Sequence, residues 1–339
     1  MKFELDRKYI EEKLVDEKAH PELPLLLYNY TPVCQFSKAW DETTMQCRGL
    51  IVHKDTKEII ARPFQKFFNY EEHVERGDTL PNETPVAYAK LDGSLGILYF
   101  FEGEPRIATR GSFTSDQALW ATNYLSESNS WQRLDQNYTH LFEIIYPENR
   151  IVINYGFEGL IHLASIHTET GKSVPPDSDF PLVGSIPFTS YQEIKALNTQ
   201  NEEGFVLHYP QADFRVKIKF EDYVRLHKVI TGLSQIGIWE MLKDGIDPYI
   251  QDIPDEMYKW LEGVVNNLRG QFEEIETMAR EVANKAKKLD TRKEQALYIA
   301  EYDNTGVIFS MLDGKDYEQV IWKMIRPKGA LSFRKDIDA

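Results

Sequence analysis

The centre of the chain reads Val86-Ala87-Tyr88-Ala89-Lys90-Leu91-Asp92-Gly93-Ser94-Leu95-Gly96-Ile97-Leu98-Tyr99-Phe100. Apolar residues flank Lys90 on both sides, and this pattern predicts two strands joined by a turn. A lysine that is desolvated between strands can lose its proton and act as a nucleophile. Gly93 lets the backbone approach a ligand closely, and Ser94 offers it a hydroxyl group. The alternative is an exposed strand lysine followed by an ordinary Lys-Leu-Asp-Gly turn.

The composition predicts a globular protein with room for two domains, because 42% of the 339 residues are hydrophobic. No run is apolar and long enough to span a membrane, and residues 1–7 lack an apolar signal core. Cys34 and Cys47 lack the spacing of metal ligands, so we expect a reducing, cytoplasmic setting. The formal net charge of −15 argues against non-specific binding along nucleic acid. It leaves room for a focused phosphate site made of clustered basic residues.

The hydrophobic period changes from two residues to about 3.6 after Asp222. Before this point, short strand patterns alternate with turn signals, including a hairpin around residues 203–220. After it, helices are predicted at residues 223–243, 256–288, 292–301 and 317–325. We therefore expect an α+β protein with an antiparallel-sheet domain at residues 1–228. An all-helical domain would follow at residues 229–339. The N-terminal residues 7–16 are expected to form a short helix, and residues 151–155 a strand.

Several predicted strands carry a charge where the pattern calls for an apolar residue. These residues are Arg48, Lys66, Lys90, Glu143, Glu203, Lys217 and Lys219. Lys217 and Lys219 are two apart and therefore point to the same face, where they would form a cationic claw for a triphosphate. A second cation near Lys90 would lower the pKa of its amine. The alternative is that each charge lies on a solvated strand face.

The two strand carboxylates, Glu143 and Glu203, could serve ribose hydroxyls or a divalent ion. Mg²⁺ prefers one or two carboxylates together with phosphate oxygens and water. A lysine nucleophile, a metal ion and cations around a phosphoryl group suit nucleotidyl transfer.

The Lys90-Leu91-Asp92-Gly93-Ser94 segment resembles motif I of the covalent nucleotidyltransferases, which include DNA ligases, RNA ligases and mRNA capping enzymes. The later motifs follow in the family's order, with Phe142-Glu143 as motif III, Glu203-Gly204-Phe205-Val206 as motif IV and Val216-Lys217-Ile218-Lys219 as motif V. Further stretches over residues 24–250 resemble the RNA ligase 1 family, the bacteriophage-type enzymes that repair tRNA. These stretches include Leu27-Tyr28-Asn29-Tyr30, Cys47-Arg48-Gly49, Arg62 to Asn69, Arg110-Gly111-Ser112 and Pro147 to Val152.

The resemblance implies that ATP is the nucleotide and that Lys90 becomes lysyl-AMP. It implies ATP contacts from further residues, with the ribose held by Glu143 and the α-phosphate by Lys217 and Lys219. The other ATP contacts are Tyr28, Arg48 and Lys66.

The remaining positions that the resemblance assigns are Glu203 and Tyr223, which are essential to the site, and Arg110, a candidate contact of the RNA end. A well-known member of the family has lysine at the position of Arg110, so charge is kept while geometry can differ. The cofactor would be Mg²⁺ or Mn²⁺. Its ligands would include Glu203 and an aspartate past motif V, Asp244 or Asp247, of which Asp247 is preferred.

The family's reaction has three steps: lysine adenylylation, transfer of AMP to an RNA 5′-phosphate, and attack by an RNA 3′-hydroxyl. The resemblance implies RNA as partner, in particular a tRNA with a broken anticodon loop, and no membrane or obligate protein partner. The setting would be the cytoplasm of a bacterium or of a virus-infected host cell.

Three alternatives remain. An mRNA capping guanylyltransferase or a DNA ligase would share motif I, but both resemblances require an OB-fold β-barrel after motif V. The sequence turns helical there, so we expect no OB-fold. A catalytically dead binding module would have lost the lysine or a motif V cation, and both are present.

The predicted helical domain contains a basic cluster. Its members are Arg280, Lys285, Lys287, Lys288, Arg292 and Lys293. Helical spacing would place Lys285, Lys288 and Arg292 near one face, which could bind the body of a tRNA. The alternative is a solvated helix surface.

Overall fold

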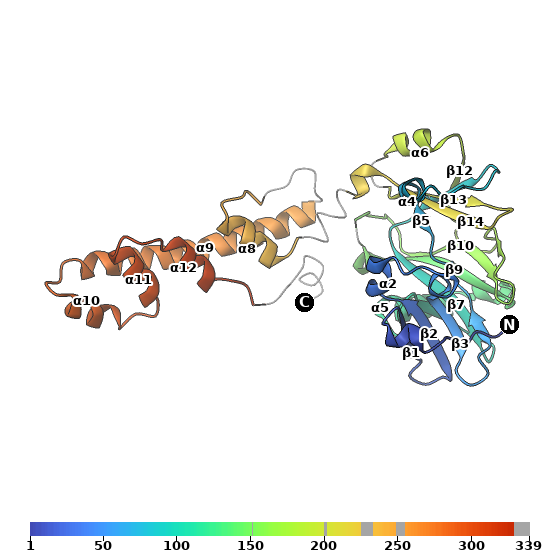
Figure 1. The fold of residues 1–339 in the computed structure, drawn as a ribbon, viewed down its shortest axis with the longest axis horizontal. Coiled ribbons are helices and arrows are strands. Elements are labelled where there is room, and N and C mark those ends of the chain that lie inside the picture. The colour runs from blue at the N-terminus through green and yellow to red at the C-terminus, as the bar shows by residue number, and fades with distance from the viewer. Residues whose placement is uncertain (151, 200–201, 225–232, 249–254, 329–339) are drawn as a thin grey trace. The chain divides into compact units, whose positions relative to one another are not determined.

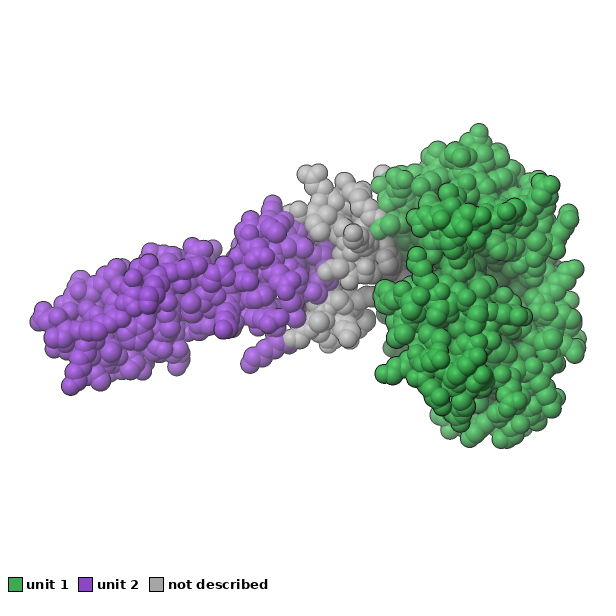
Figure 2. Space-filling model, in the orientation of Figure 1, with its two compact units in different colours: residues 1–225 green, residues 226–339 purple. Residues whose placement is uncertain are grey.

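The computed structural model describes residues 1–150, 152–199, 202–224, 233–248 and 255–328 (Figure 1). The chain divides into two compact units, unit 1 at residues 1–225 and unit 2 at residues 226–339 (Figure 2). The predicted domain boundary at residue 228 lies outside the described residues.

Unit 1 is built on three sheets. The first has the order β1 (Val15–Ala19), β2 (Leu25–Tyr30), β3 (Arg48–His53), β4 (Ile59–Ala61). The second has the order β11 (Ser173–Val174), β10 (Gly159–His167), β9 (Tyr138–Ile145), β7 (Ser94–Phe101), β8 (Glu104–Thr109). The third has the order β12 (Ser185–Pro187), β6 (Val86–Lys90), β13 (Gly204–Tyr209), β14 (Phe214–Lys219), β5 (Phe68–Asn69).

Short helices connect and cover these sheets. They are α1 (Lys8–Glu11), α2 (Pro32–Ser37), α3 (Glu42–Gln46), α4 (Tyr70–Arg76), α5 (Asp116–Glu127), α6 (Tyr191–Leu197) and the 3₁₀ turns at Asn129–Arg133 and Pro147–Asn149. Helix α5 begins after Ser115, because the Ser115 hydroxyl accepts a hydrogen bond from the Ala118 amide at 3.3 Å.

The second sheet is buried on both faces, which explains the nearly continuous apolar run of β7. Ile97 and Tyr99 pack against the first sheet, in a core that includes Leu27. Leu98, between them in sequence, points to the opposite face and packs against Leu125 of α5. The alternation of a strand thus serves two cores at once.

Most of the sequence-based expectations for unit 1 are confirmed, and some are wrong. The sheets are antiparallel as predicted, except that β5 pairs with β14 in parallel. The expected helix at residues 7–16 is only one turn long, because β1 begins at Val15 and pairs with β2. Residues 152–155 form no strand.

The helices of unit 2 are joined by short non-helical segments within its described residues. Its helices are α8 (Gln235–Lys243), α9 (Asp255–Ala286), α10 (Arg292–Ile299), α11 (Thr305–Leu312) and α12 (Glu318–Met324). The shorter helices pack their apolar residues, such as Val307 and Ile321, against Val282 and its neighbours on α9. The sequence did not predict α11. No helix among the described residues is both long and apolar enough to cross a membrane.

The prediction that Lys285, Lys288 and Arg292 lie on one face of a helix is wrong. Helix α9 ends at Ala286, so Lys288 lies in a turn and Arg292 begins the next helix. Two members of the cluster are also ion-paired. Arg280 pairs with Glu276, and Arg292 pairs with Asp313 at 2.6 Å.

Candidate active site

Lys90 is the last residue of β6, next to the central strand of the third sheet. Strand β13 lies between β6 and β14, and Gly204 at its start is opposite Lys90 on one side and Lys219 on the other. The preceding residue, Glu203, therefore reaches both amines. Its carboxylate oxygens lie 2.6 Å from Lys90 Nζ and 2.8 Å from Lys219 Nζ. Glu203 is only 3% exposed, so the two cations compensate a buried charge, while Lys90 is 23% exposed and open to a reactant.

The turn after Lys90 is fixed by the carboxylate of Asp92. One oxygen accepts hydrogen bonds from the amides of Val152 and Ile153 at 2.7 and 3.0 Å. The other accepts from the Tyr223 hydroxyl at 2.7 Å, and the Asp92 amide donates to Tyr155. Sequence reasoning singled out Tyr223 but not this partner. The aspartate of the motif thus acts as an anchor for the loop that carries the lysine.

Glu143 lies on β9, on the face of the second sheet that meets the third sheet. Its carboxylate accepts a hydrogen bond from the Gly93 amide at 2.9 Å. Burial raises the pKa of Glu143 to about 7, although the Lys90 ammonium lowers it. The nearby Glu203 carboxylate adds to the rise. Glu143 can therefore change its charge near neutral pH.

Lys217 is surrounded by other cations. Burial and the charges of Lys66, Arg48 and Lys90 lower its pKa to about 7. Like charges held this close repel one another, and an anion bound among them relieves that repulsion. The arrangement suits a polyphosphate. Lys217 and Lys219 are two apart on β14 and share a face, as strand alternation predicts.

Aromatic rings contact three of these cations, Arg48, Lys66 and Lys217. The Phe67 ring centroid lies 5.6 Å from both the Arg48 guanidinium carbon and Lys217 Nζ. Lys66 Nζ lies 5.0 to 5.6 Å from the rings of Trp40, Tyr30 and Phe68. Cation–π contacts of this kind position a cation without neutralising it.

Tyr28 does not join this group, although it was predicted to contact ATP. Its hydroxyl donates to Glu17 on the neighbouring strand at 2.9 Å, and its ring packs near Phe3 in a separate core. Tyr30, two residues later, lies beside Lys66 instead. Its hydroxyl accepts a hydrogen bond from Arg110 at 3.1 Å, which brings Arg110 to the same region.

Comparison with known proteins matches residues 46–179 to the RNA ligase family, a range that includes Arg48, Lys66, Lys90 and Glu143. The chain is 22% identical to an RNA ligase of Rhodothermus phage RM378, over 86% of each protein. Over this range the chain is similar to RNA ligases.

Another relative of this chain is a candidate bifunctional polynucleotide kinase/RNA ligase of Autographa californica nuclear polyhedrosis virus. The two are 31% identical over 69% of this chain, which spans only 40% of the viral protein. Among solved structures, a candidate ATP-dependent DNA ligase from Aquifex aeolicus aligns over 91% of this chain and 98% of its own. That alignment has a TM-score of 0.48 and 14% identity.

The carboxylates of this site fit a divalent ion at Glu143 and Glu203. These are two interacting carboxylates beside Lys90, and a cation would relieve their repulsion. The described residues contain no group of three or more side chains of the metal-ligating types. Asp247 belongs to unit 2, and its role as a ligand stays a prediction.

Proposed function

We propose that the protein is an ATP-dependent RNA ligase that joins RNA 3′-hydroxyl and 5′-phosphate ends through lysyl-AMP and an adenylylated RNA end. The main support is the buried Glu203 carboxylate, which bridges Lys90 and Lys219 within a group of cations. This geometry holds a lysine amine beside the place where a nucleotide phosphate would bind.

In the first step, the Lys90 amine attacks the α-phosphorus of ATP, and pyrophosphate leaves. Glu203 positions the Lys90 amine, which lies 2.6 Å from its carboxylate. Lys217 and Lys219 hold the α-phosphate and stabilise the charge that develops on it. Arg48 and Lys66 would bind the phosphates that leave, and Glu143 the ribose.

Mg²⁺ or Mn²⁺, held by Glu143 and Glu203, would neutralise phosphate charge during these steps. Glu203 would then exchange part of its contact with the lysines for the ion. Asp247 is a further candidate ligand.

The proposed substrate is RNA, in particular a tRNA with a broken anticodon loop, in the cytoplasm of a bacterium or an infected host cell. Arg110 would contact the RNA end and Tyr223 would keep the loop of Lys90 in place through Asp92. Unit 2 would dock the body of the tRNA through the lysines of its basic cluster, which form no ion pair with another described residue. No obligate protein partner is proposed.

The test is incubation with labelled ATP or GTP, followed by a denaturing gel. Covalent label from ATP that disappears in Lys90→Met supports the proposal. Label from GTP would indicate a capping enzyme, and no label a binding module. Sealing of a nicked anticodon stem-loop in preference to a nicked DNA duplex separates an RNA ligase from a DNA ligase.

A further inference from the structure

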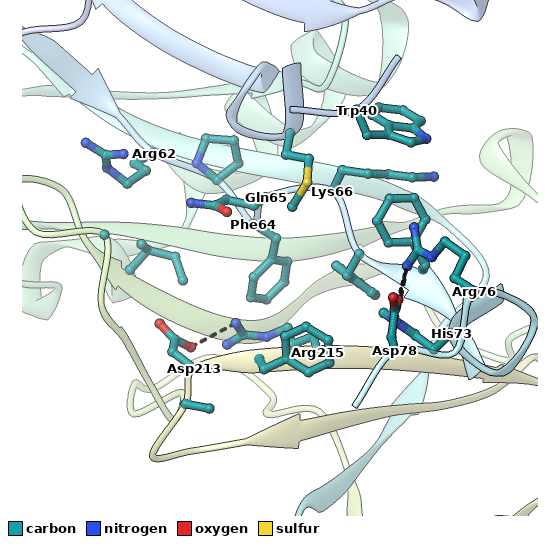
Figure 3. Close-up of a pocket in the computed structure, with 18 of the residues that line it drawn as sticks. Trp40, Arg62, Phe64, Gln65, Lys66, His73, Arg76, Asp78, Asp213 and Arg215 are labelled. Atoms are coloured by element: carbon teal, nitrogen blue, oxygen red, sulfur yellow. Dashed lines mark hydrogen bonds and ion pairs between the residues drawn. The ribbon is translucent and has the colours of Figure 1, made fainter. Parts of the chain in front are cut away.

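A groove of about 780 Å³ opens in unit 1 between residues 62–68 and the tip of the β13–β14 hairpin (Figure 3). This volume is in the range of about 300–1,000 Å³ that is usual for pockets of small ligands. Arg62 lies at one end, and Trp40 and Arg76 at the other. The charged side chains that line it are Arg62, Lys66, Arg76, Arg215, Asp78 and Asp213.

The groove carries an excess of positive charge, with four cations against two carboxylates. Arg76 pairs with Asp78 at 2.7 Å and Arg215 with Asp213 at 3.0 Å. Arg62 is 7% exposed, and within the described residues its guanidinium bonds only to neutral groups, such as the Thr168 carbonyl. In a chain with a net charge of −15, this local excess points to an anionic ligand.

The groove adjoins the proposed ATP site through two shared residues, Lys66 and Phe67. Lys66 lines the groove and also lowers the pKa of Lys217. Phe67 lines the groove and contacts both Arg48 and Lys217. Arg215 and Lys217 are two residues apart on β14, so they share a face and lie about 7 Å apart along the strand. The groove therefore begins where the pyrophosphate end of ATP would lie.

The chemistry of the proposed reaction indicates which group enters the groove after pyrophosphate has left. Displacement at phosphorus places the attacking and leaving atoms roughly in line, so pyrophosphate leaves on the side opposite Lys90. In the second step an oxygen of the RNA 5′-phosphate forms a bond to the same phosphorus. The bond to Lys90 Nζ breaks, and the amine keeps the electron pair and takes up a proton from solvent. The RNA phosphate must therefore come from the side that pyrophosphate left.

We propose that this groove binds the terminal nucleotide that carries the RNA 5′-phosphate. Lys66 and Arg215 bind the 5′-phosphate. Arg76 binds the next phosphate at the rim of the groove, and the ring of Phe64 packs against a base. Aromatic side chains bind bases of any sequence in this way, and basic side chains bind the backbone. The inference rests on the proposed function.

The test isolates the second step in the full-length protein. Lysyl-AMP enzyme is prepared with labelled ATP and mixed with a limiting concentration of a short 5′-phosphorylated RNA, and AMP transfer to the RNA is timed. The variants are Phe64→Leu, which keeps apolar volume without the ring, and Arg76→Gln at the exposed rim. Arg133→Gln is the matched control, because Arg133 also pairs with an aspartate at 2.7 Å but does not line the groove.

We expect lysyl-AMP formation to stay within about twofold of the parent protein in all three variants. AMP transfer should slow by about tenfold in Phe64→Leu and Arg76→Gln, and remain unchanged in Arg133→Gln. Normal transfer in Arg76→Gln, or in a folded Phe64→Leu, would overturn the groove assignment. Absence of lysyl-AMP in the parent protein would instead overturn the proposed function.

Discussion

Lys217 has a pKa lowered to about 7, first by burial and then by the charges of Lys66 and Arg48. Only its protonated form attracts the α-phosphate, so the charge is present below pH 7 and lost as the pH rises. We expect the affinity for α,β-methylene-ATP to fall above pH 7, by at most about tenfold per pH unit. Calorimetric titration between pH 6 and pH 9 measures this.

Lys217→Arg is the informative variant, because arginine stays charged over this whole range. The fall in affinity should become flatter in this variant. Glu143 provides the competing explanation, because its pKa is also raised to about 7 by burial. A slope that persists in Lys217→Arg and disappears in Glu143→Gln would assign the effect to Glu143 instead.

Lys90 accepts AMP in the first step and gives it up in the second, but it is not needed for the third. Lys90→Met should abolish AMP attachment and the sealing of ordinary 5′-phosphate RNA with ATP. The variant should still seal RNA that is already adenylylated, because the 3′-hydroxyl then attacks without help from the lysine amine. Gel assays of both substrates test this, and AMP attachment that survives in the variant would contradict the assignment of Lys90.

At the scale of elements, the start of strand β13 determines the geometry of the site. Gly204 has a φ of +137°, and a side-chain Cβ there would lie 2.0 Å from the Ile218 carbonyl oxygen. Gly204→Ala should therefore lower stability by about 1–3 kcal/mol and displace Glu203 from its two lysines. Urea unfolding and the AMP-labelling assay measure these two effects.

Gly103→Ala is the control for this prediction. Gly103 also has a positive φ, +83°, but a Cβ at that position meets no atom within 4 Å. Gly103→Ala should lower the free energy of unfolding by about 1 kcal/mol through backbone strain alone, and AMP labelling of Lys90 should persist. Equal loss of labelling in both variants would show that the contact at Ile218 is not the cause.

The far end of the same hairpin is held by the Asp213 carboxylate. Burial alone would raise its pKa, but hydrogen bonds with His208 and Ser173 and the charge of Arg215 hold the pKa well below its usual range. The stabilisation is therefore complete above the carboxyl's unfolded pKa of about 4 and is lost as the pH falls below it.

Asp213→Asn should lower the free energy of unfolding by about 1–3 kcal/mol at pH 7, because charged hydrogen bonds are lost. The difference from the parent protein should shrink as the pH falls toward 3. Asp179→Asn serves as control, since its partner Arg133 is exposed and such pairs contribute little. A pH-independent difference would mean that the Asp213 charge is not what stabilises the hairpin.

At the scale of the whole molecule, unit 2 is the proposed tRNA-docking part. Arg292 is already paired with Asp313, so the lysines of the basic cluster are the better candidates for phosphate contacts. Lys285→Glu/Lys288→Glu should remove the preference for a broken tRNA over a plain single strand and flatten the salt dependence of tRNA binding. Lysyl-AMP formation should be unaffected. An unchanged tRNA preference, with a normal circular dichroism spectrum, would make the cluster an ordinary solvated surface.

The sequence by itself determined the local parts of the site. Three short-range patterns carried this information. They are the motif from Lys90 to Ser94, the strand alternation that places Lys217 and Lys219 on one face, and the change of hydrophobic period after Asp222. Local patterns fix which residues share a face, because side-chain direction follows from the backbone period. They predicted the sheets and the helical character of the C-terminal part.

The tertiary structure alone decided which distant residues meet. Strand alternation predicts that Tyr28 and Tyr30 lie on the same face, so the sequence does not distinguish their roles. Only the residues that each one contacts in the folded protein do so. Likewise, no spacing in the sequence shows that Glu203 lies between Lys90 and Lys219. That contact exists because β13 is inserted between β6 and β14. Burial and the charges of other strands then move the pKa of Lys217, and both depend on long-range packing that no local pattern encodes.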